Sequence, residues 1–424
     1  WPLGSTSPSR TRSPARYRVV TKAQSCDCDA LIVGAGMIGS TCALALARKG
    51  LSVAVLDKQP IYRETQGEPQ RVSAINQASE NILRHLDAWT GIAVSRPQAF
   101  ERIEVWDSKS SGTISFDAAD VGLAHLGHIV SNDAISSALH QALTSETSVS
   151  LRFGETPAAI TSSGAGVAIT LDNGETMRAY LLIGADGANS NVRELAGITH
   201  QESAYDHTAI VATVTPEQPH NSCARQRFLT SGPLAFLPLA DNECSIVWSA
   251  RTGRAEQLLA LDDNAFALEL ADAFEGRLGN ISKVSARAEF PLLRRHATDY
   301  IGERIALVGD AAHTVHPLAG LGANQGFADA AALVEVVANA FSQNRDPASH
   351  SVLRRYERWR RGENALVLKV MDGFHGLFGT ENPTLAGLRG AGLNLTDRIP
   401  FIKEAFIRYA VGLEGDLPEL ARMR

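Results

Sequence analysis

The sequence predicts an α/β fold that contains parallel strand–helix units and antiparallel hairpins and ends in helices. Three strand–turn–helix patterns begin near Ala30, Tyr180 and Arg304. Between them, segments with alternating apolar residues and turn residues are typical of antiparallel hairpins. After Ser351 the apolar residues recur at helical spacing. This order of elements indicates a mixed α/β protein rather than an all-helical or all-β one.

Composition limits the classes of function. The chain has 424 residues, more than one ordinary domain, and 44% hydrophobic residues are enough for a substantial core. The net charge is −6 and the globular part has no long basic run, so we expect no nucleic-acid binding. Five scattered cysteines favour a reducing compartment. No apolar run reaches the length of about 18 residues that a membrane-spanning helix needs.

Residues 1–25 differ from the rest of the chain. They contain four Arg, one Lys and no acidic residue, with many Ser and three Pro. Such a segment cannot build a core, and we expect a disordered leader or tag. The run "PLGS" resembles a protease-cleavage scar, whereas the Arg- and Ser-rich composition also suits an organelle transit peptide. Both interpretations stay open, and the segment is left out of the fold.

The first strand–turn–helix pattern predicts a dinucleotide site. After the apolar strand 30–33, Gly34, Gly36 and Gly39 form GxGxxG. The first glycine permits the turn, the second lets the backbone approach a pyrophosphate, and the third lets the helix pack closely. Asp57 ends the next strand, where a carboxylate can accept hydrogen bonds from a ribose diol. The motif alone does not choose between NAD and FAD.

The second pattern is the segment "YLLIGADGANSNVREL". Residues 180–185 predict a strand, Asp186 and Gly187 a turn, and Ser190 or Asn191 the N-cap of a helix. Taken alone, this pattern also fits an ordinary strand-to-helix junction.

The third pattern, "RIALVGDAAHTVHPLAGLGANQG", places Asp310 at the carboxyl end of a predicted strand, where α/β sheets bind ligands. We expect Pro317, Gly320 and Gly322 to shape a loop against a planar ligand. A helix is predicted from about Ala323, with its positive end toward that ligand.

His313 and His316 form HxxH within this loop, but no Glu lies between them and no third ligand follows at metal spacing. We therefore predict no metal site there, and polar contacts that hold the loop instead.

Antiparallel structure is predicted in two hairpins, residues 102–117 and residues 235–250, the second turning at Asp241 and Asn242. Residues 256–279 predict a helix. In the C-terminal region, "RRYERWRR" at 354–361 predicts a solvated helix face, with contact to a partner or anionic lipid as the alternative. The amphipathic helix that starts at Pro400 either packs on the rest of the protein or attaches peripherally to a membrane.

Together, the three motifs resemble the flavoprotein aromatic hydroxylases of the para-hydroxybenzoate hydroxylase fold. That family carries GxGxxG, a central "DG" motif and a later "GDAAH…P…G.G.N.G..DA" motif, in this order. Within it, the sequence is most similar to the ubiquinone-biosynthesis hydroxylases, whose mark is "HP.AGQG.N.G". Further matches are residues 70–89, "QRVSAINQASENILRHLDAW", and the ending "AVGLEGDLPELAR". Leu321 departs from the Gln usual in this subfamily, which puts in doubt a polar contact near the flavin.

The resemblance implies an α/β fold with a Rossmann-like FAD-binding domain, an inserted antiparallel-sheet substrate domain and a helical C-terminal region. The FAD-binding domain would be discontinuous, with residues 26–100, 120–200 and 285–350. The substrate domain would comprise residues 101–119 and 201–284, and the C-terminal region residues 351–424.

The resemblance also implies roles for single residues. Gly34, Gly36 and Gly39 would hold the FAD pyrophosphate and Asp57 the adenosine ribose. Arg71 would approach the pyrophosphate or ribityl chain, and Asp310 would bind ribityl hydroxyls. The remaining predicted cofactor-binding residues are the motif positions Asp186 and Gly187, Gly309 beside Asp310, and the flavin-flanking Pro317, Gly320, Gly322 and Asn324. No side chain is identified as a catalytic acid or base.

The implied activity is that of an FAD-dependent monooxygenase. NAD(P)H would reduce FAD, and a flavin C4a-hydroperoxide formed with O₂ would hydroxylate an aromatic ring, here a prenylated phenol or quinol of ubiquinone biosynthesis. The alternatives are a hydroxylase of a soluble phenol or polyketide, and a non-catalytic carrier of the same nucleotide fold. We expect a cytoplasmic protein, peripheral on the inner membrane, or one on the mitochondrial matrix side. Partner contact in a membrane or biosynthetic complex would use the C-terminal region.

Overall fold

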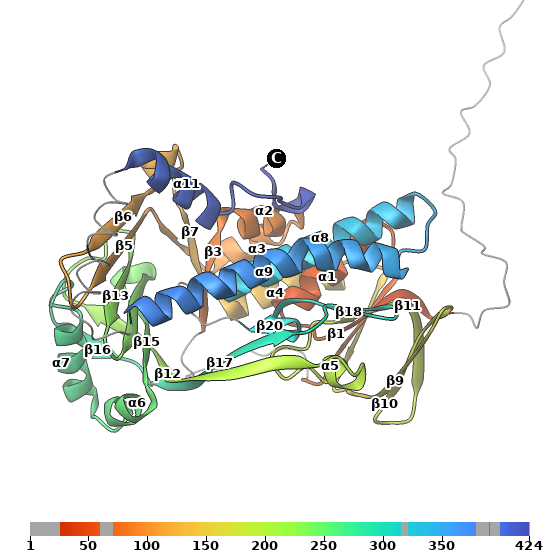
Figure 1. Ribbon diagram of the computed structural model, residues 1–424, viewed down its shortest axis with the longest axis horizontal. Helices are drawn as coiled ribbons and strands as arrows, with labels where there is room; N and C mark the ends of the chain where they lie inside the picture. The colour runs from red at the N-terminus through yellow and green to blue at the C-terminus, as the bar shows by residue number, and fades with distance from the viewer. Residues whose placement is uncertain (1–25, 60–70, 315–320, 379–389, 391–398, 424) are drawn as a thin grey trace, which may run out of the picture.

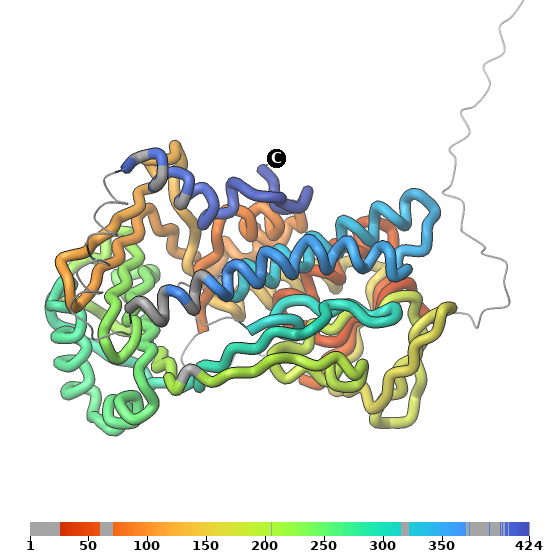
Figure 2. Tube along the Cα trace, in the orientation of Figure 1, coloured from red at the N-terminus to blue at the C-terminus, as the bar shows by residue number. Residues whose placement is uncertain are grey.

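The fold comes from a computed structural model that describes residues 26–59, 71–314, 321–378, 390 and 399–423 (Figure 1). Two large sheets lie toward opposite ends of the molecule. Helix α9 runs along one side between them (Figure 1). Strands β12 and β17 lie side by side and lead from one end toward the other (Figure 2).

The first sheet has the strand order β18-β19-β11-β1-β2-β8, in which the strands from β19 to β8 are parallel. Strands β1, β2 and β19 are short apolar runs, since residues at the centre of a parallel sheet are buried on both faces. Strands β10 and β9 extend the sheet from β11 as antiparallel neighbours. Helices α1, α4 and α8 share one hydrophobic core with this sheet. The bounds are β1 Cys28–Val33, β2 Val53–Asp57, β8 Val149–Phe153, β9 Pro157–Ser163, β10 Gly166–Leu171, β11 Thr176–Gly184, β18 Ile301–Gly302, β19 Ile305–Leu307, α1 Met37–Arg48, α4 Asn132–Thr144 and α8 Leu321–Ser342.

The second sheet has the order β20-β17-β12-β15-β14-β13-β5-β6, with β16 paired to β12. Neighbouring strands are antiparallel apart from the parallel pair of β13 and β5. Helices α6 and α7 bury one of its faces in a separate core. The bounds are β5 Arg102–Asp107, β6 Thr113–Asp117, β12 His200–Pro216, β13 Cys223–Leu229, β14 Gly232–Pro238, β15 Cys244–Arg251, β16 Ile281–Val284, β17 Ala288–Ala297, β20 His313–Thr314, α6 Thr252–Leu259 and α7 Asp263–Ala273.

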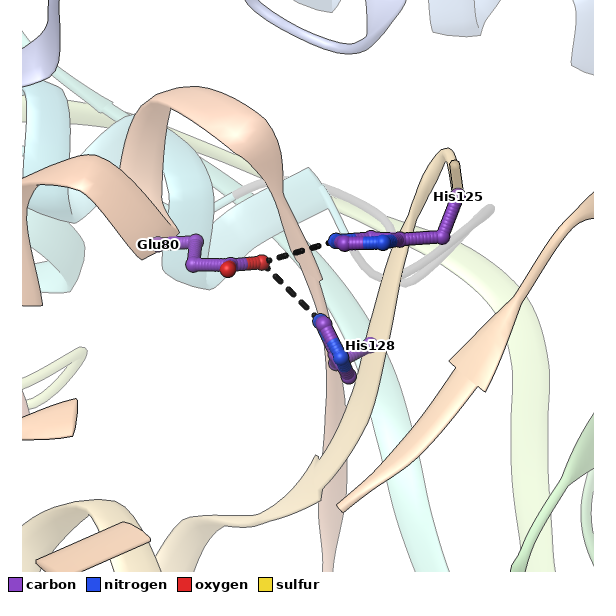
Figure 3. A group of neighbouring side chains, drawn as sticks. All are labelled: Glu80, His125 and His128. Atoms are coloured by element: carbon purple, nitrogen blue, oxygen red, sulfur yellow. Dashed lines mark hydrogen bonds and ion pairs between the residues drawn. The ribbon is translucent and has the colours of Figure 1, made fainter. Parts of the chain in front are cut away.

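A small third sheet, in the order β3-β7-β4, lies beside the first. Its strands are β3 Val72–Asn76, β4 Gln98–Phe100 and β7 Gly127–Ser131, and helices α2 Gln77–His85 and α3 Trp89–Val94 follow β3. Asn76 caps α2 by accepting the N–H of Ser79. Figure 3 shows Glu80 of α2 pointing toward two histidines at β7.

The C-terminal helices are α9 His350–Phe378 and α11 Pro400–Ala410. The predicted solvated face at residues 354–361 is wrong in part, since Tyr356 is fully buried and Arg360 is only 2% exposed. They lie on the side of α9 that contacts α8, whereas the exposed residues of the run are Arg354, Arg355 and Arg358. Positions three or four residues apart on a helix face the same side, and a charged residue can occupy such a buried position when it is paired there.

The predicted hairpins 102–117 and 235–250 are confirmed as β5–β6 and β14–β15. The single helix predicted over residues 256–279 is wrong. The structure divides this region into α6 and α7, because Asp262 caps a new helix by accepting the N–H of Ala265. Residues 1–25 lie outside the described residues, and the predicted domain ranges stay a prediction.

Candidate cofactor-binding site

The glycine-rich turn between β1 and α1 is the first part of the site. Gly34 has a φ of +105°, and a Cβ there would lie 2.3 Å from the carbonyl oxygen of Ala185. A Cβ on Gly39 would lie 1.8 Å from the carbonyl oxygen of Gly34. The fold itself therefore requires glycine at both positions. A Cβ on Gly36 would have no heavy atom within 4 Å, so this glycine leaves open space beside the turn.

The N-terminus of α1 has the chemistry of an anion site. Its first turn contains no acidic residue, and no side chain caps it at Gly36. The free N–H groups and the positive end of the helix dipole therefore stay available. Since the open space at Gly36 lies at the same place, these residues fit the pyrophosphate of a dinucleotide.

Asp57 ends β2 and shapes the glycine-rich turn. Its Oδ2 accepts the N–H of Ala35 at 2.6 Å, and its Oδ1 accepts that of Gln59 at 2.8 Å. The Nε2 atom of His140 lies 2.6 Å from the carbonyl oxygen of Ala35. The turn is thus held from two sides, and His140 is a contributor that the sequence analysis missed. The contact of Asp57 with a ribose stays a prediction.

The central motif forms a capped turn. Asp186 accepts a hydrogen bond from the hydroxyl of Ser190 at 2.5 Å and from the N–H of Val192 at 3.0 Å. Ser190 in turn accepts the N–H of Arg193, which confirms Ser190 as the N-cap of helix α5 (Asn191–Leu195). The adjacent Gly187 has a φ of +82°, the left-handed region that favours glycine. Asp186 therefore fixes the turn, and its contact with FAD or NAD(P)H stays a prediction.

Arg193 connects the central motif to the third one. It is 6% exposed, and its guanidinium donates to the carbonyl oxygens of Ala188 at 2.9 Å and Ala311 at 2.8 Å. Burial lowers its pKa. Since Ala311 directly follows Asp310, Arg193 holds the backbone beside the carboxylate predicted to bind the ribityl chain. Only its position in a short helix was apparent from the sequence.

Ile38 of α1 joins the first motif to the third. A Cβ on Gly326 would lie 2.8 Å from the Cγ1 atom of Ile38, and one on Gly309 would lie 3.4 Å from it. Glycine at these two positions therefore lets α1 approach α8 and the turn after β19. The first and third motifs, nearly 300 residues apart, meet at this side chain.

Asp310 lies in the 3₁₀ turn η3 (Gly309–Ala311) after β19. Its side chain is accessible to solvent, yet dense surrounding protein desolvates the carboxylate and raises its pKa, against the effect of His313 and Arg71. The carboxylate is thus reachable from solvent although protein atoms surround it densely, as expected for a group that accepts hydrogen bonds from a bound ligand.

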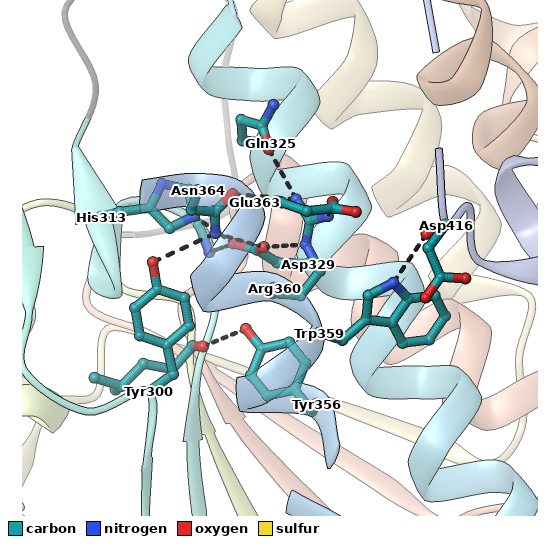
Figure 4. Close-up of polar contacts among 12 residues, drawn as sticks. Tyr300, His313, Gln325, Asp329, Tyr356, Trp359, Arg360, Glu363, Asn364 and Asp416 are labelled. Atoms are coloured by element: carbon teal, nitrogen blue, oxygen red, sulfur yellow. Dashed lines mark hydrogen bonds and ion pairs between the residues drawn. The ribbon is translucent and has the colours of Figure 1, made fainter. Parts of the chain in front are cut away.

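Asp329 of α8 is the centre of a buried polar network (Figure 4). It is fully buried, and its Oδ2 accepts the N–H of Gly309 at 3.1 Å and lies 2.5 Å from Nε2 of His313. Its Oδ1 accepts hydrogen bonds from Arg360 at 2.8 Å and Asn364 at 3.1 Å, both on α9. One carboxylate thus ties α9 to the backbone next to Asp310.

The network contains a buried ion pair. Burial raises the pKa of Asp329, but His313 and Arg360 outweigh this effect and lower it to about 2. Burial likewise opposes the charge of Arg360, yet Asp329 and Glu363 raise its pKa overall. Such a pair is stable only when both partners are present and hydrogen-bonded. Asp329 is the aspartate at the "G..DA" end of the third motif, and its role could not be predicted from the sequence.

Asn324 contacts the backbone of β3, and Arg71 directly precedes this strand. The Nδ2 group of the buried Asn324 donates to the carbonyl oxygen of Ala74 at 2.8 Å, and its Oδ1 accepts the N–H of Asn76 at 3.1 Å. Asn324 therefore holds β3 against α8. Arg71 is exposed, and its guanidinium lies 5.1 Å from the ring centroid of Phe290. The positive charge of Arg71 also lowers the pKa of Asp310, against the larger effect of desolvation.

Helix α8 begins at Leu321, earlier than the predicted start near Ala323, so Gly322 belongs to its first turn and not to a loop. Pro317, Gly320 and His316 lie outside the described residues, as does the side chain of Leu321.

A family comparison decides the identity of this site. Residues 27–369 match the family described as FAD binding domain, which is more than half of the chain. The chain belongs to this family. The match covers all three motifs, and it confirms FAD as the predicted cofactor.

Three relatives carry names of enzymes of ubiquinone biosynthesis. The chain is 38% identical to 3-demethoxyubiquinol 3-hydroxylase of Escherichia coli, over 90% of this chain and 98% of the relative. It is 36% identical to the ubiquinone hydroxylase UbiL of Rhodospirillum rubrum, over 93% and 92%. It is 34% identical to the mitochondrial ubiquinone biosynthesis monooxygenase COQ6 of Homo sapiens, over 90% and 92%. These relatives confirm the resemblance predicted from the motifs.

Solved structures show the same fold. The p-nitrophenol 4-monooxygenase PnpA of Pseudomonas putida superimposes with a TM-score of 0.73 at 18% identity, covering 92% of this chain and 98% of that one. PqsL of Pseudomonas aeruginosa superimposes with a TM-score of 0.71 at 21% identity, covering 87% and 100%. The predicted fold class, an FAD-binding α/β domain with an antiparallel sheet, is thereby confirmed. None of the helices within the described ranges combines the length and apolar character needed to cross a membrane.

Proposed function

We propose that this FAD-binding protein hydroxylates the aromatic ring of a prenylated phenol or quinol in ubiquinone biosynthesis, with NAD(P)H as reductant and O₂ as oxidant. The observation that carries the proposal is the similarity, over nine-tenths of the chain, to hydroxylases and monooxygenases named for this pathway. This similarity supports the ubiquinone-pathway substrate over a soluble phenol or polyketide.

Bound FAD would supply the transfer of electrons from NAD(P)H and the activation of O₂. The chain's own residues would position it. The N-terminus of α1 at Gly36 would hold the pyrophosphate and Asp57 the adenosine ribose. Arg71 and Asp310 would contact the ribityl chain between the first and third motifs. The first turn of α8 has no acidic residue, so its positive end would stabilise negative charge on the flavin ring.

One face of the second sheet supports an apolar substrate. Val211 of β12 and Val247 of β15 are direct partners across the two strands. Phe290 of β17 is paired with Ala209, two residues before Val211, so its ring projects from the same face. Val211, Val247 and Phe290 are all partly exposed. Because the ring of Phe290 also contacts Arg71, this apolar surface lies next to residues predicted to bind FAD.

The opposite face of this sheet is not available to a ligand. The apolar stretches "LAFLPL" (residues 234–239) and "SIVW" (residues 245–248) overlap strands β14 and β15. Their residues Leu234, Phe236, Ile246 and Trp248 are each at most 2% exposed. They form the core beneath α6 and α7. The contribution of these stretches to a substrate pocket is therefore limited to the alternate positions, which project from the face that carries Val247.

A prenyl chain would dominate the affinity for such a surface. Burial of apolar area contributes about 25 cal/mol per Å², so a chain of several isoprene units outweighs single polar contacts of the ring. We expect prenylated phenol to stimulate NAD(P)H oxidation and to yield ring-hydroxylated product at far lower concentration than the same phenol without the chain. An equal response to both compounds, or preference for a small charged phenol, would contradict the proposal.

A matched pair of variants locates the substrate surface. Val247→Asp places a charge on the proposed face and should raise the KM for the prenylated phenol by roughly tenfold or more, with FAD content unchanged. Val94→Asp changes an apolar residue that is 83% exposed on α3 and should leave the KM unchanged. Equal KM values for the two variants would place the substrate elsewhere.

A further inference from the structure

Three side chains from separate parts of the chain converge beside α2 (Figure 3). Glu80 belongs to α2, His125 precedes β7, and His128 lies in β7. The Nε2 atom of His125 lies 3.2 Å from Oε2 of Glu80, and the Nδ1 atom of His128 lies 2.9 Å from the same oxygen. The nitrogen and oxygen atoms of the three residues all lie within 4.8 Å of one another.

This donor set is that of a transition-metal site. Imidazole nitrogen suits Zn²⁺, Cu²⁺, Fe²⁺ and Ni²⁺, and two histidines with one carboxylate form a frequent three-ligand set for such ions. In a tetrahedral zinc site with bonds of about 2.0–2.1 Å, neighbouring ligand atoms lie about 3.3 Å apart. The two oxygen–nitrogen separations at Glu80, 3.2 and 2.9 Å, are close to this value, and the two nitrogens lie within 4.8 Å of each other. An ion would enter after movements of the two rings.

The surroundings orient the three ligands. Glu80 is 3% exposed, and its second oxygen, Oε1, lies 2.6 Å from the guanidinium of Arg84. That guanidinium lies 4.9 Å from the ring centroid of Trp89, and the ring of His128 meets the same indole edge-on at 5.1 Å. Arg84 therefore leaves Oε2 to the two imidazoles, in the way that outer partners fix metal ligands. Its positive charge also lowers the affinity for a cation.

One side of the cluster is open to solvent. The side chain of His125 is 24% exposed, compared with 13% for His128 and 4% for Glu80. An ion would enter beside His125, and a water molecule would complete its coordination there. A three-ligand site with a fourth position for water is the usual form of an open zinc site.

We propose that Glu80, His125 and His128 bind one divalent transition-metal ion, with Zn²⁺ as the expected occupant. Its role is to brace α2 against β7. β7 is paired with β3, and Asn324 of α8 holds the backbone of β3, so the brace lies one strand away from Asn324, a residue predicted to flank the flavin. The proposal concerns a site separate from FAD and does not depend on the substrate.

Calorimetry and a coloured probe test the site directly. The FAD-loaded protein is treated with chelator, freed of the chelator, and titrated with ZnCl₂ alone. We expect one equivalent of Zn²⁺ per chain and a higher midpoint of thermal unfolding. Co²⁺ in place of Zn²⁺ should give visible absorption bands typical of a low-coordinate nitrogen–oxygen site. These bands are measured on the flavin-free protein, because the flavin itself absorbs visible light. Absence of binding by the wild-type protein would overturn the proposal and leave a hydrogen-bonded cluster.

Substitutions separate this site from adventitious binding. His125→Asn changes the most exposed ligand, and its fold is checked by FAD content and circular dichroism. We expect Zn²⁺ affinity to fall by at least about tenfold, and further in the variant that also carries His128→Asn. The matched control is His200→Asn, since His200 lies 3.7 Å from Glu202 on a solvent-accessible strand and should not affect binding. Unchanged affinity in the double variant would place the ion elsewhere and contradict the assignment.

Discussion

The Nε2 atom of His313 lies 2.5 Å from the Oδ2 atom of Asp329, and both side chains are buried. The same oxygen accepts the N–H of Gly309, so one carboxylate on α8 holds both ends of the segment that contains Asp310. Arg360 then ties this carboxylate to α9. Helix α9, which crosses the molecule between its two large sheets, is therefore linked to the cofactor site through a buried ion pair (Figures 1 and 4).

Replacing Arg360 tests this link. Arg360→Leu removes the guanidinium and leaves the buried carboxylate of Asp329 without one of its two charged partners, which should cost about 3–5 kcal/mol of unfolding free energy. The control Arg254→Gln breaks an ion pair with Glu269 whose side chains are 38% and 47% exposed, and should cost about 0–1 kcal/mol. Urea denaturation of the FAD-free proteins measures both values. Similar losses in the two variants would show that Asp329 does not depend on Arg360.

The sequence identified the motifs of the site better than the contacts that hold them. GxGxxG and the segment around Asp310 could be recognised as ligand-binding motifs, because the residues that define each motif lie within a few positions of one another in the sequence. Arg193 and Arg360 could not be placed, since their partners lie 118 and 31 residues away and an arginine on a helix is exposed in most proteins. In the run 354–361, buried and exposed positions differ only in their place in the helical period, because charged residues occupy positions of both kinds.

The sequence also did not predict where helix α8 begins or which face of strand β14 is buried. The early start of α8 at Leu321 follows from tertiary contact of its first turn with β3 through Asn324, which no local propensity reports. The apolar strand "LAFLPL" was correctly placed in a hairpin, but its alternation could not tell which face meets α6 and α7 and which meets a ligand. The cluster of Glu80 and His128 joins residues 48 positions apart and has no motif spacing.

Asp310→Asn should separate cofactor binding from stability. The raised pKa of this carboxyl means that its ionised form is disfavoured in the folded protein, so above the pKa of the unfolded chain its charge lowers stability. We expect the FAD-free variant to be as stable as the wild type or more stable at neutral pH. FAD affinity should fall roughly ten- to a hundredfold, from the loss of hydrogen bonds to a charged acceptor worth about 1.5–3 kcal/mol. Fluorescence titration with FAD and urea denaturation provide the two measurements, and unchanged affinity would contradict the ribityl assignment.

The glycines of the first motif should divide into two kinds. Gly39→Ala places a Cβ 1.8 Å from a backbone oxygen, so it should destabilise the FAD-free protein by about 1–3 kcal/mol or more. Gly36→Ala meets no protein atom within 4 Å and should change stability by less than about 1 kcal/mol. It should nevertheless weaken FAD binding, because the methyl group occupies the space predicted for the pyrophosphate. Equal FAD affinity of Gly36→Ala and wild type would show that the pyrophosphate does not approach there.

The pH dependence of stability should report on His296, which lies 3.0 Å from the hydroxyl of Tyr300 beside the buried network. Burial, together with the charges of His313, Arg361 and Arg294, lowers the pKa of His296 from 6.5 to about 4. Between these two values the unfolded chain binds a proton that the folded protein does not, so stability should decrease as pH falls from about 6.5 to 4. Asp329, with a lowered pKa of about 2, contributes stability that is lost only below about pH 4 and does not overlap this window.

His296→Gln keeps a hydrogen-bonding group near Tyr300 but cannot take up the proton. The wild-type protein should therefore lose more unfolding free energy than the variant between pH 6.5 and 4, and the difference between the two curves removes contributions from other groups, including the raised pKa of Asp310. His200→Gln, on a solvent-accessible strand, serves as the control for the loss of a histidine. Urea denaturation at closely spaced pH values gives the three curves. If both variants show the same pH dependence of unfolding free energy as the wild type, His296 binds its proton equally in the folded and the unfolded protein. Its burial then has no effect on acid stability.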